Sequence, residues 1–313
     1  MEKLVECVPN FSEGRDRAKM DAIVGAMLAG GDVALLDRQM DSDHHRSVIT
    51  LAGPPEAVGE AAVRGAGRAA ELIDLTLHQG AHPRMGATDV VPFVPLRGVT
   101  LEDCVRIAEW AAEQIWLRFQ IPTFLYGAAA RRPDRRDLEN IRRGQFEKLR
   151  RGVASDPALR PDFGEPRLHP TAGATAVGAR NFLIAYNIHL SADDARAARA
   201  IARKIRASSG GLPCVKAIGI WLPSRKLAQV SINLTDYEVT SLETIFDAVE
   251  REAAALEVRV LGSEIVGLVP RQALPADAEH RLRIENYRAE RILENRLAQA
   301  LERTPPFSAG PGR

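Results

Sequence analysis

Hydrophobic and polar positions follow a pattern along this chain that occurs twice. In the first half the pattern predicts two helices, over residues 15–28 and from Pro55 to about Asp74, and strands at 4–8, 33–36, 47–51 and 90–94. In the second half it predicts two helices, which begin near Ser191 and Thr240, and strands at 181–190, 215–222, 226–234 and 258–262. Both halves therefore have the order β-α-β-β-α-β, the split βαβ unit of ferredoxin-like folds.

A further helix and strand are predicted between the two halves. Thr100-Leu-Glu-Asp103 is a helix start signal for a helix to about Arg118, and a strand over 122–126 ends at Gly127. The segment that follows is polar, and residues 131–151 contain nine Arg or Lys and four acids. Such a charged run is usually a solvated linker, although it could also guide an anionic ligand.

The length of the chain favours more than one domain. At 313 residues it exceeds the size at which one hydrophobic core stops growing. We therefore predict an α/β protein of two ferredoxin-like subdomains, 1–180 and 181–275, that face each other across a ligand cleft. Residues 276–313 should add an amphipathic helix from Ala278 to Glu302, which packs on the body or on a second subunit, and a frayed end.

Composition excludes several classes of protein. Lys and Arg total 42 and Asp and Glu 41, so there is no broad positive field for nucleic acid or for an anionic membrane. The cysteines Cys7, Cys104 and Cys214 are too far apart for a disulfide framework or a cysteine zinc site. The amino-terminal residues MEKLVECVPNF have no apolar core of signal-peptide length, and no later run reaches membrane-spanning length. A cytoplasmic protein that acts on small molecules is therefore expected.

The segment HQGAHPRMGATDVVPF, from His78 to Phe93, is the strongest candidate for an active-site loop. It combines two histidines, an arginine and an acid just ahead of a strand, which is more chemistry than a turn requires. Pro83 favours extended backbone at His82, so the side chains of His82 and Arg84 should point the same way. His82 could then act as an acid–base catalyst while Arg84 holds a carboxylate. In the alternative, His82 caps a turn and Arg84 makes a surface ion pair.

Metal binding is a second interpretation of this part of the chain. Four of the seven histidines fall between residues 44 and 82, and the possible ligands are Asp41, Asp43, His44, His45, His78 and His82. Their spacing matches no specific metal-binding rule. A helix that would bring His78 and His82 together is doubtful because Gly80 and Pro83 interrupt it. No metal is expected, and a metal-dependent hydrolase remains a less favoured alternative.

Two glycine-rich stretches differ in what they predict. Gly65-Ala-Gly67-Arg-Ala-Ala imitates a dinucleotide-binding motif, but it lies within a predicted helix and does not follow a strand, so that prediction is discarded. Residues 163–182 contain three glycines and two prolines just before the second repeat. Glycine allows backbone to approach a flat ligand closely, so this junction is either part of a ligand cleft or a flexible connector.

Five longer motifs carry a resemblance to a known family. They are VECVPNFSEGRD (5–16), HRSVIT (45–50), HPRMGATDVVPF (82–93), GARNFLIAYNIHL (178–190) and LAQVSINLTDYEVT (227–240). The chain resembles the formiminotransferase family over about residues 2–275. The resemblance implies ferredoxin-like halves, a folate-binding tunnel between them and a homodimer. It also implies the stand-alone bacterial form, without the cyclodeaminase domain that is fused to vertebrate members.

The resemblance implies an activity and a set of site residues. The family transfers a formimidoyl group between N-formimidoyl-L-glutamate and tetrahydrofolate in histidine degradation, with tetrahydrofolate as co-substrate. By similarity His82 is catalytic, and Arg84, Arg46 and Asn10 bind substrate. The folate-binding segment corresponds to Gly164, Glu165, Pro166, Arg167, Leu168, His169, Pro170, Thr171, Ala172 and Gly173.

Two departures from the family pattern leave questions open. Vertebrate members have DVD where this chain has Asp37-Arg38-Gln39, so Asp41 or Asp43 would have to replace the acid that orients the histidine. The folate segment also lacks the aromatic residues of FVPSW. This leaves the affinity for the pterin and its identity open. A folate enzyme that acts on 5-formyltetrahydrofolate is an alternative. An RNA-binding protein is a weaker one, because aromatic residues are only 5% of the chain and none alternate with basic residues along a strand.

Overall fold

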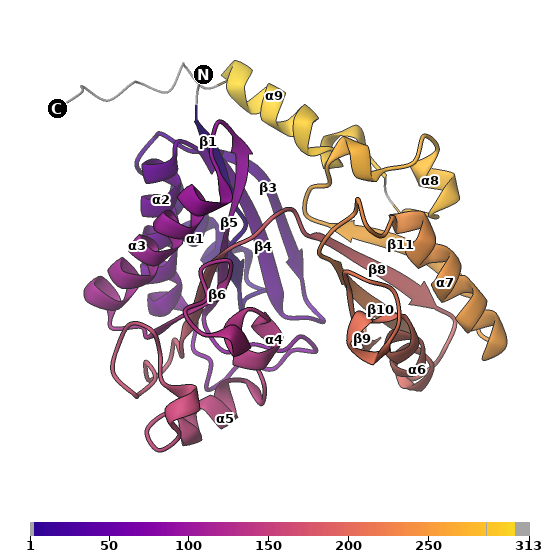
Figure 1. Cartoon of the computed structure of the whole chain (residues 1–313), viewed down its shortest axis with the longest axis horizontal. Helices are drawn as coiled ribbons and strands as arrows, with labels where there is room; N and C mark the ends of the chain where they lie inside the picture. Colours follow the sequence, from indigo (N-terminus) through magenta and orange to yellow (C-terminus); the bar gives the residue numbers. More distant parts are fainter. Residues whose placement is uncertain (1–2, 286, 304–313) are drawn as a thin grey trace. The chain divides into compact units, whose positions relative to one another are not determined.

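The computed structural model describes residues 3–285 and 287–303, and the predicted frayed end lies outside this range. The chain divides into two compact units, one up to Arg180 and the other from Asn181 to Gln299 (Figure 1). Each unit has its own hydrophobic core and its own sheet. That the two units face each other across a ligand cleft stays a prediction.

The sheet of the first unit contains a complete ferredoxin-like motif. Its strands are β1 (Leu4–Cys7), β2 (Asn10–Phe11), β3 (Ala34–Asp41), β4 (Arg46–Gly53), β5 (Thr88–Arg97), β6 (Thr123–Gly127) and β7 (Thr175–Ala179). Strands β1 and β2 lie between β4 and β5, and β3 pairs with β4. The predicted β-α-β-β-α-β order is therefore confirmed. Strands β7 and β6 extend the sheet beyond β5, and both of these pairings are parallel.

Helices pack on both faces of this sheet. On one face lie α1 (Arg17–Leu28), α2 (Pro55–Leu72) and α3 (Leu101–Phe119), over a core that includes Phe11, Ile49 and Phe93. On the other face, α4 (Leu138–Ile141) and α5 (Gln145–Gly152) contribute Ile141 and Leu149 to a smaller cluster with residues of β5, β6 and β7. Because side chains alternate along a strand, polar residues of β2 and β4 point to this second face.

The glycines that imitate a dinucleotide-binding motif serve helix packing instead. A Cβ atom on Gly65 would lie 2.7 Å from Met27 of α1, and one on Gly67 would lie 2.3 Å from the ring of Phe119 in α3. Both positions therefore allow α2 to lie close to its two neighbouring helices. Helix packing therefore gives these two glycines a structural reason.

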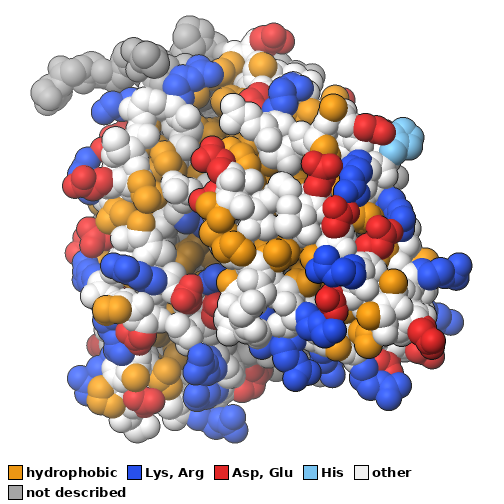
Figure 2. Space-filling model, turned by 45° about the vertical axis from the view of Figure 1, so that its right-hand side comes forward, with side chains coloured by type: hydrophobic (Ala, Val, Ile, Leu, Met, Phe, Trp, Pro, Cys, Tyr) orange, Lys and Arg blue, Asp and Glu red, His pale blue; other side chains and the backbone are white. Residues whose placement is uncertain are grey.

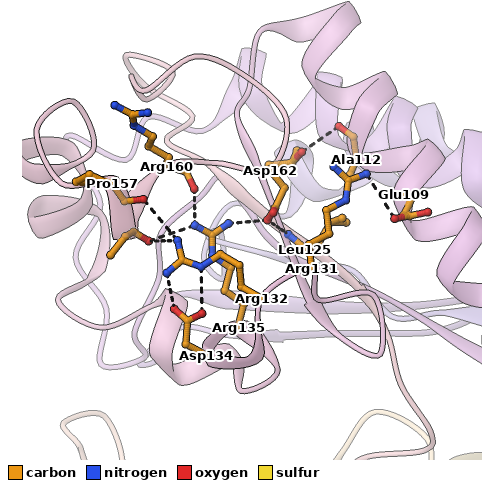
Figure 3. A network of polar contacts seen from close by, with 12 residues as sticks. Glu109, Ala112, Leu125, Arg131, Arg132, Asp134, Arg135, Pro157, Arg160 and Asp162 are labelled. Carbon is orange, nitrogen blue, oxygen red and sulfur yellow. Dashed lines mark hydrogen bonds and ion pairs between the residues drawn. The ribbon is translucent and has the colours of Figure 1, made fainter.

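The polar segment after β6 is folded rather than an open linker. It forms α4, α5 and two short 3-10 helices, η1 (Pro133–Arg135) and η2 (Pro157–Leu159). Arg135 is only 4% exposed and donates to the carboxylate of Asp162 at 2.7 Å and to the carbonyl of Ala158 at 3.2 Å (Figure 3). Asp162 in turn accepts a hydrogen bond from the backbone N–H of Leu125 in β6 at 2.8 Å. This part of the basic run is therefore a structural clamp.

Replacing Asp162 with asparagine is expected to lower the free energy of unfolding by about 1–3 kcal/mol, because it leaves a buried guanidinium without its ionic partner. Arg135 would keep its bonds to backbone carbonyls, which limits the loss. Urea unfolding measures the change. Asp134→Asn removes an exposed carboxylate from the same network and should have little effect, so equal losses in the two variants would contradict the clamp.

The second unit is an antiparallel ferredoxin-like sheet. Its elements are β8 (Ile184–Leu190), α6 (Arg196–Ile205), η3 (Ala207–Ser209), β9 (Val215–Leu222), β10 (Leu227–Leu234), α7 (Leu242–Ala255) and β11 (Val260–Val266). The strand order is β11-β8-β10-β9, so the prediction for the second half is also confirmed. The start of α7 is one residue later than predicted. Ser241 caps the helix by accepting from the N–H of Thr244, while Thr240 donates to the carbonyl of Pro213.

The predicted helix from Ala278 to Glu302 is wrong as one continuous element. The structure has α8 (Ala278–Arg281), η4 (Arg271–Ala273) before it, η5 (Ala289–Arg291) and then α9 (Leu293–Arg303). Arg283 has a left-handed φ of 49°, and Ser263 of β11 exchanges backbone hydrogen bonds with Arg283 and Glu285 at 2.8 Å. Pairing with a strand of the same unit therefore interrupts the helical pattern.

The surface agrees with the balanced composition. On the face drawn in Figure 2, positive and negative side chains are interspersed. Among the described residues, no helix is both long and apolar enough to cross a membrane.

Candidate active site

The candidate site of the first unit is built around a bulge in β5. Asn10 of β2 pairs with Val90 and Phe11 pairs with Thr88, so Asp89 is an extra residue between the paired positions. A bulge of this kind redirects a side chain. Val91 and Phe93, two and four residues farther along β5, face the helices, whereas the side chain of Asp89 lies among polar groups. Asp89 is fully buried, and one of its carboxylate oxygens accepts from the N–H of Met85 at 2.8 Å.

Two arginines share the other carboxylate oxygen of Asp89. Arg46, at the start of β4, donates to it at 2.6 Å, and Arg142, which follows α4, lies 2.7 Å from it. Arg46 also donates from Nε to the side-chain oxygen of Asn10 at 3.0 Å. The predicted substrate-binding residues Arg46 and Asn10 therefore lie in one cluster. The structure adds Asp89 and Arg142 to it.

The backbone fixes the tautomer of His82. Its Nδ1 atom lies 2.7 Å from the carbonyl oxygen of Pro83, so Nδ1 carries the proton and donates it. The Nε2 atom then holds the free lone pair that a general base requires. The loop is held close to β3 and β4, because the N–H of Ala81 donates to the backbone carbonyl of Asp43 and a Cβ on Gly80 would lie 2.3 Å from the carbonyl of His44.

Burial and nearby positive charges keep His82 neutral. Burial lowers its pKa well below the ordinary value, and the cations Arg46 and Arg142 lower it further, as does His44. Burial also lowers the pKa of Arg46, to about 10, although Asp89 opposes this shift. At neutral pH the imidazole of His82 is therefore a proton acceptor beside two guanidinium groups.

Asp41 is tied to His44 rather than to His82. Its carboxylate accepts from the N–H of His44 at 2.8 Å and lies 2.9 Å from Nδ1 of the same residue. The rings of His44 and His82 are 6.0 Å apart between centroids and are tilted by 49°. The group that orients His82 is thus a backbone carbonyl, and Asp41 orients the neighbouring histidine.

His78, His45 and Arg84 form a second cluster. His78 and His45 stack at 4.3 Å, and Nε2 of His78 lies 2.9 Å from the carbonyl oxygen of His45. Arg84 donates from Nε to Nδ1 of His78 at 3.2 Å and makes a bidentate pair with Glu147 at 2.6 and 2.9 Å. Burial, with a smaller effect of His78, lowers the pKa of His45 to about 4. Arg84 is therefore committed to protein groups, and its role in substrate binding stays a prediction.

The predicted folate segment lies beside the loop that carries His82. His169 and Gly173 exchange backbone hydrogen bonds, and Ala172 and Ala174 on either side of Gly173 bond to the backbone of Ala87 and Met85. Gly173 needs its φ of +70°, and a Cβ there would lie 2.3 Å from the carbonyl of Met85. The residues at which the segment is exposed are Gly164, Glu165, Pro166, Arg167 and Pro170. That it binds folate stays a prediction.

Within residues 3–285 and 287–303, no three His, Cys, Asp or Glu side chains are grouped in a way that could hold a metal ion. The candidate ligands are instead spread over the two clusters described above. In the second unit, fully buried His189 lies among Glu285 at 3.0 Å, Gln229 at 3.2 Å and Arg225 at 3.2 Å. These contacts satisfy the imidazole, which points to a structural role for it.

The sequence analysis assigned no role to two members of the site. Asp89 had a usable signal, since an acid within the apolar run DVVPF needs a buried partner. Arg142 had none, because it is one of many arginines in the basic run, and only the fold shows that it reaches Asp89.

Comparisons with known proteins cover nearly all of the chain. Residues 4–180 match the formiminotransferase domain, N-terminal subdomain, and residues 185–302 match the formiminotransferase domain. The chain is 45% identical to a glutamate formimidoyltransferase of Streptococcus pyogenes serotype M1, over 95% of this chain and 99% of that protein. A protein of the same name from Thermoplasma acidophilum is 43% identical, over 95% and 98%. The mouse formimidoyltransferase-cyclodeaminase is 42% identical, over 98% of this chain and 58% of the mouse protein.

Proposed function

The chain belongs to the formiminotransferase family, and we propose that it transfers a formimidoyl group between N-formimidoyl-L-glutamate and tetrahydrofolate. The observation that carries this proposal is the identity of 45% over nearly the full length of both chains with a protein named for this activity. The site supports it, because a neutral histidine beside two arginines suits proton transfer on an anionic substrate.

The proposed mechanism uses His82 as both base and acid. The N5 amine of tetrahydrofolate attacks the amidine-like carbon of formimidoylglutamate, and Nε2 of His82 accepts the proton that this amine loses. A tetrahedral intermediate forms. His82 then returns the proton to the glutamate nitrogen as the bond between that nitrogen and the carbon breaks. The Nδ1 contact to Pro83 holds the ring for both steps.

The finer parts of the proposal follow from the same family. Tetrahydrofolate is the co-substrate, residues 164–173 contact it, and the reaction serves histidine degradation in the cytoplasm. We also propose a homodimer, which light scattering of the purified protein would test.

A substrate panel tests the activity directly. The purified protein, treated with EDTA, is incubated with N-formimidoyl-L-glutamate and tetrahydrofolate, and the release of glutamate is measured. We expect release that depends on folate and needs no added metal. Consumption of glutamate, with formation of N-formylglutamate and tetrahydrofolate, when 5-formyltetrahydrofolate and glutamate are the only active pair would favour the alternative folate enzyme. Metal-dependent release without folate would favour a hydrolase.

A further inference from the structure

The side chain of Arg142 has capacity for a further partner. Its ion pair with Asp89 is made through one terminal nitrogen, at 2.7 Å. Its Nε atom is buried and has no hydrogen-bond partner among the residues that the structure describes. Leaving a buried donor unsatisfied is costly, so such a donor at a candidate site indicates a ligand group that is not part of the protein.

The charge around Arg142 points to an anion. The cations Arg46 and Arg142 share the single carboxylate of Asp89, and His82 is neutral. A third cation, Arg180, hydrogen-bonds to Tyr126, whose ring belongs to the same face of the sheet.

Other acids near this cluster do not balance the excess. Burial raises the pKa of Glu6 to about 7, although Arg180 opposes this, so Glu6 is only partly ionised at neutral pH. Asp41 is paired with His44, and Glu147 is paired with Arg84. The site therefore has excess positive charge in a place where an unbalanced charge is unfavourable.

We propose that Arg142 binds a carboxylate of the formimidoylglutamate substrate next to His82. This inference rests on the proposed function, and it assigns to Arg142 the role that sequence reasoning gave to Arg84. Arg84 already satisfies Glu147, Gln145 and His78. Arg142 is held at one terminal nitrogen by Asp89, so its fork is oriented before the substrate arrives.

Binding of a non-reacting analogue tests the inference without requiring turnover. Isothermal titration calorimetry is carried out with N-formyl-L-glutamate and with its two monoamides, in which one carboxylate is neutral. For the unchanged protein, one of the monoamides should bind more weakly than the diacid. Arg142→Gln should weaken binding of the diacid by about 10- to 100-fold and remove the difference between the diacid and that monoamide.

The neighbouring Arg143 provides a matched control. It is exposed and donates to Asn140, so Arg143→Gln should leave binding unchanged. Arg142→Lys keeps the positive charge but lacks the Nε donor, and it replaces the glutamine variant in the test if that variant fails to fold. It should show a smaller loss of selectivity between the diacid and the monoamide.

Two outcomes separate this inference from the proposed function. Unchanged binding in folded Arg142 variants, in an enzyme that still transfers the formimidoyl group, would overturn the role of Arg142 alone. Failure of the unchanged protein to turn over formimidoylglutamate would overturn the proposed function.

Discussion

Replacing His82 with alanine is expected to lower kcat by about 10²- to 10⁴-fold, the range in which a positioned acid–base group contributes. The reason is that Nε2 of His82 is the acceptor left free by the contact of Nδ1 with Pro83. Steady-state kinetics with formimidoylglutamate and tetrahydrofolate measure the loss. Binding of folate should persist, because the segment at residues 164–173 makes its own backbone contacts.

The pH dependence of the unchanged protein gives a second test of His82. Because burial and two arginines lower its pKa well below 6.5, the imidazole stays neutral as the pH falls through 6.5. The proton-accepting form is lost only at lower pH, when the pH approaches the lowered pKa. The value of kcat/KM should therefore show no fall near pH 6.5 that is assignable to His82.

His280→Ala is the matched control, since the His280 side chain is 82% exposed and pairs with Asp277 in the second unit. It should leave kcat unchanged. If His82→Ala kept more than a tenth of the activity, acid–base catalysis by this residue would be excluded. Recovery of turnover by added imidazole would support it.

The parts of the fold that the sequence predicted are those in which the local pattern and the tertiary structure agree. Both ferredoxin-like halves have strands and helices with a regular apolar face, and periodicity is sufficient to identify them. Strand β7 was not predicted, because Thr175–Ala179 is made of small residues that resemble a connector. Its place between β5 and β6 depends on contacts that are distant in sequence.

The candidate site could be predicted only in part for a similar reason. His82 lies in a dense local motif, so it was identified directly. Its partners lie elsewhere in the chain, and the contact between Asp89 and Arg142 joins residues 53 positions apart. For Arg84, the extended backbone predicted the direction of the side chain. It could not predict that this side chain forms an ion pair with Glu147, which is distant in sequence.

Replacing Asp89 with asparagine is expected to have the largest effect on stability among the site residues. The free energy of unfolding should fall by about 3–5 kcal/mol, because Arg46 and Arg142 would lose the buried carboxylate that they share. The kcat/KM should also fall, by about 100-fold, since the two arginines would no longer be held beside His82. Urea unfolding and steady-state kinetics measure the two effects. Asp21→Asn, on an exposed carboxylate of α1, should change neither quantity appreciably.

The pH dependence of stability identifies the cause of this loss. Burial alone would raise the pKa of Asp89, but Arg142, Arg46 and the N–H of Met85 outweigh burial and lower it. A carboxyl with a lowered pKa stabilises the fold above its unfolded pKa, about 3.9, and this contribution is lost as the pH falls through the lowered value. The difference in stability between the unchanged protein and Asp89→Asn should therefore be constant near pH 7 and shrink in acid. A difference that persists when Asp89 is protonated would mean that packing, rather than charge, explains the effect.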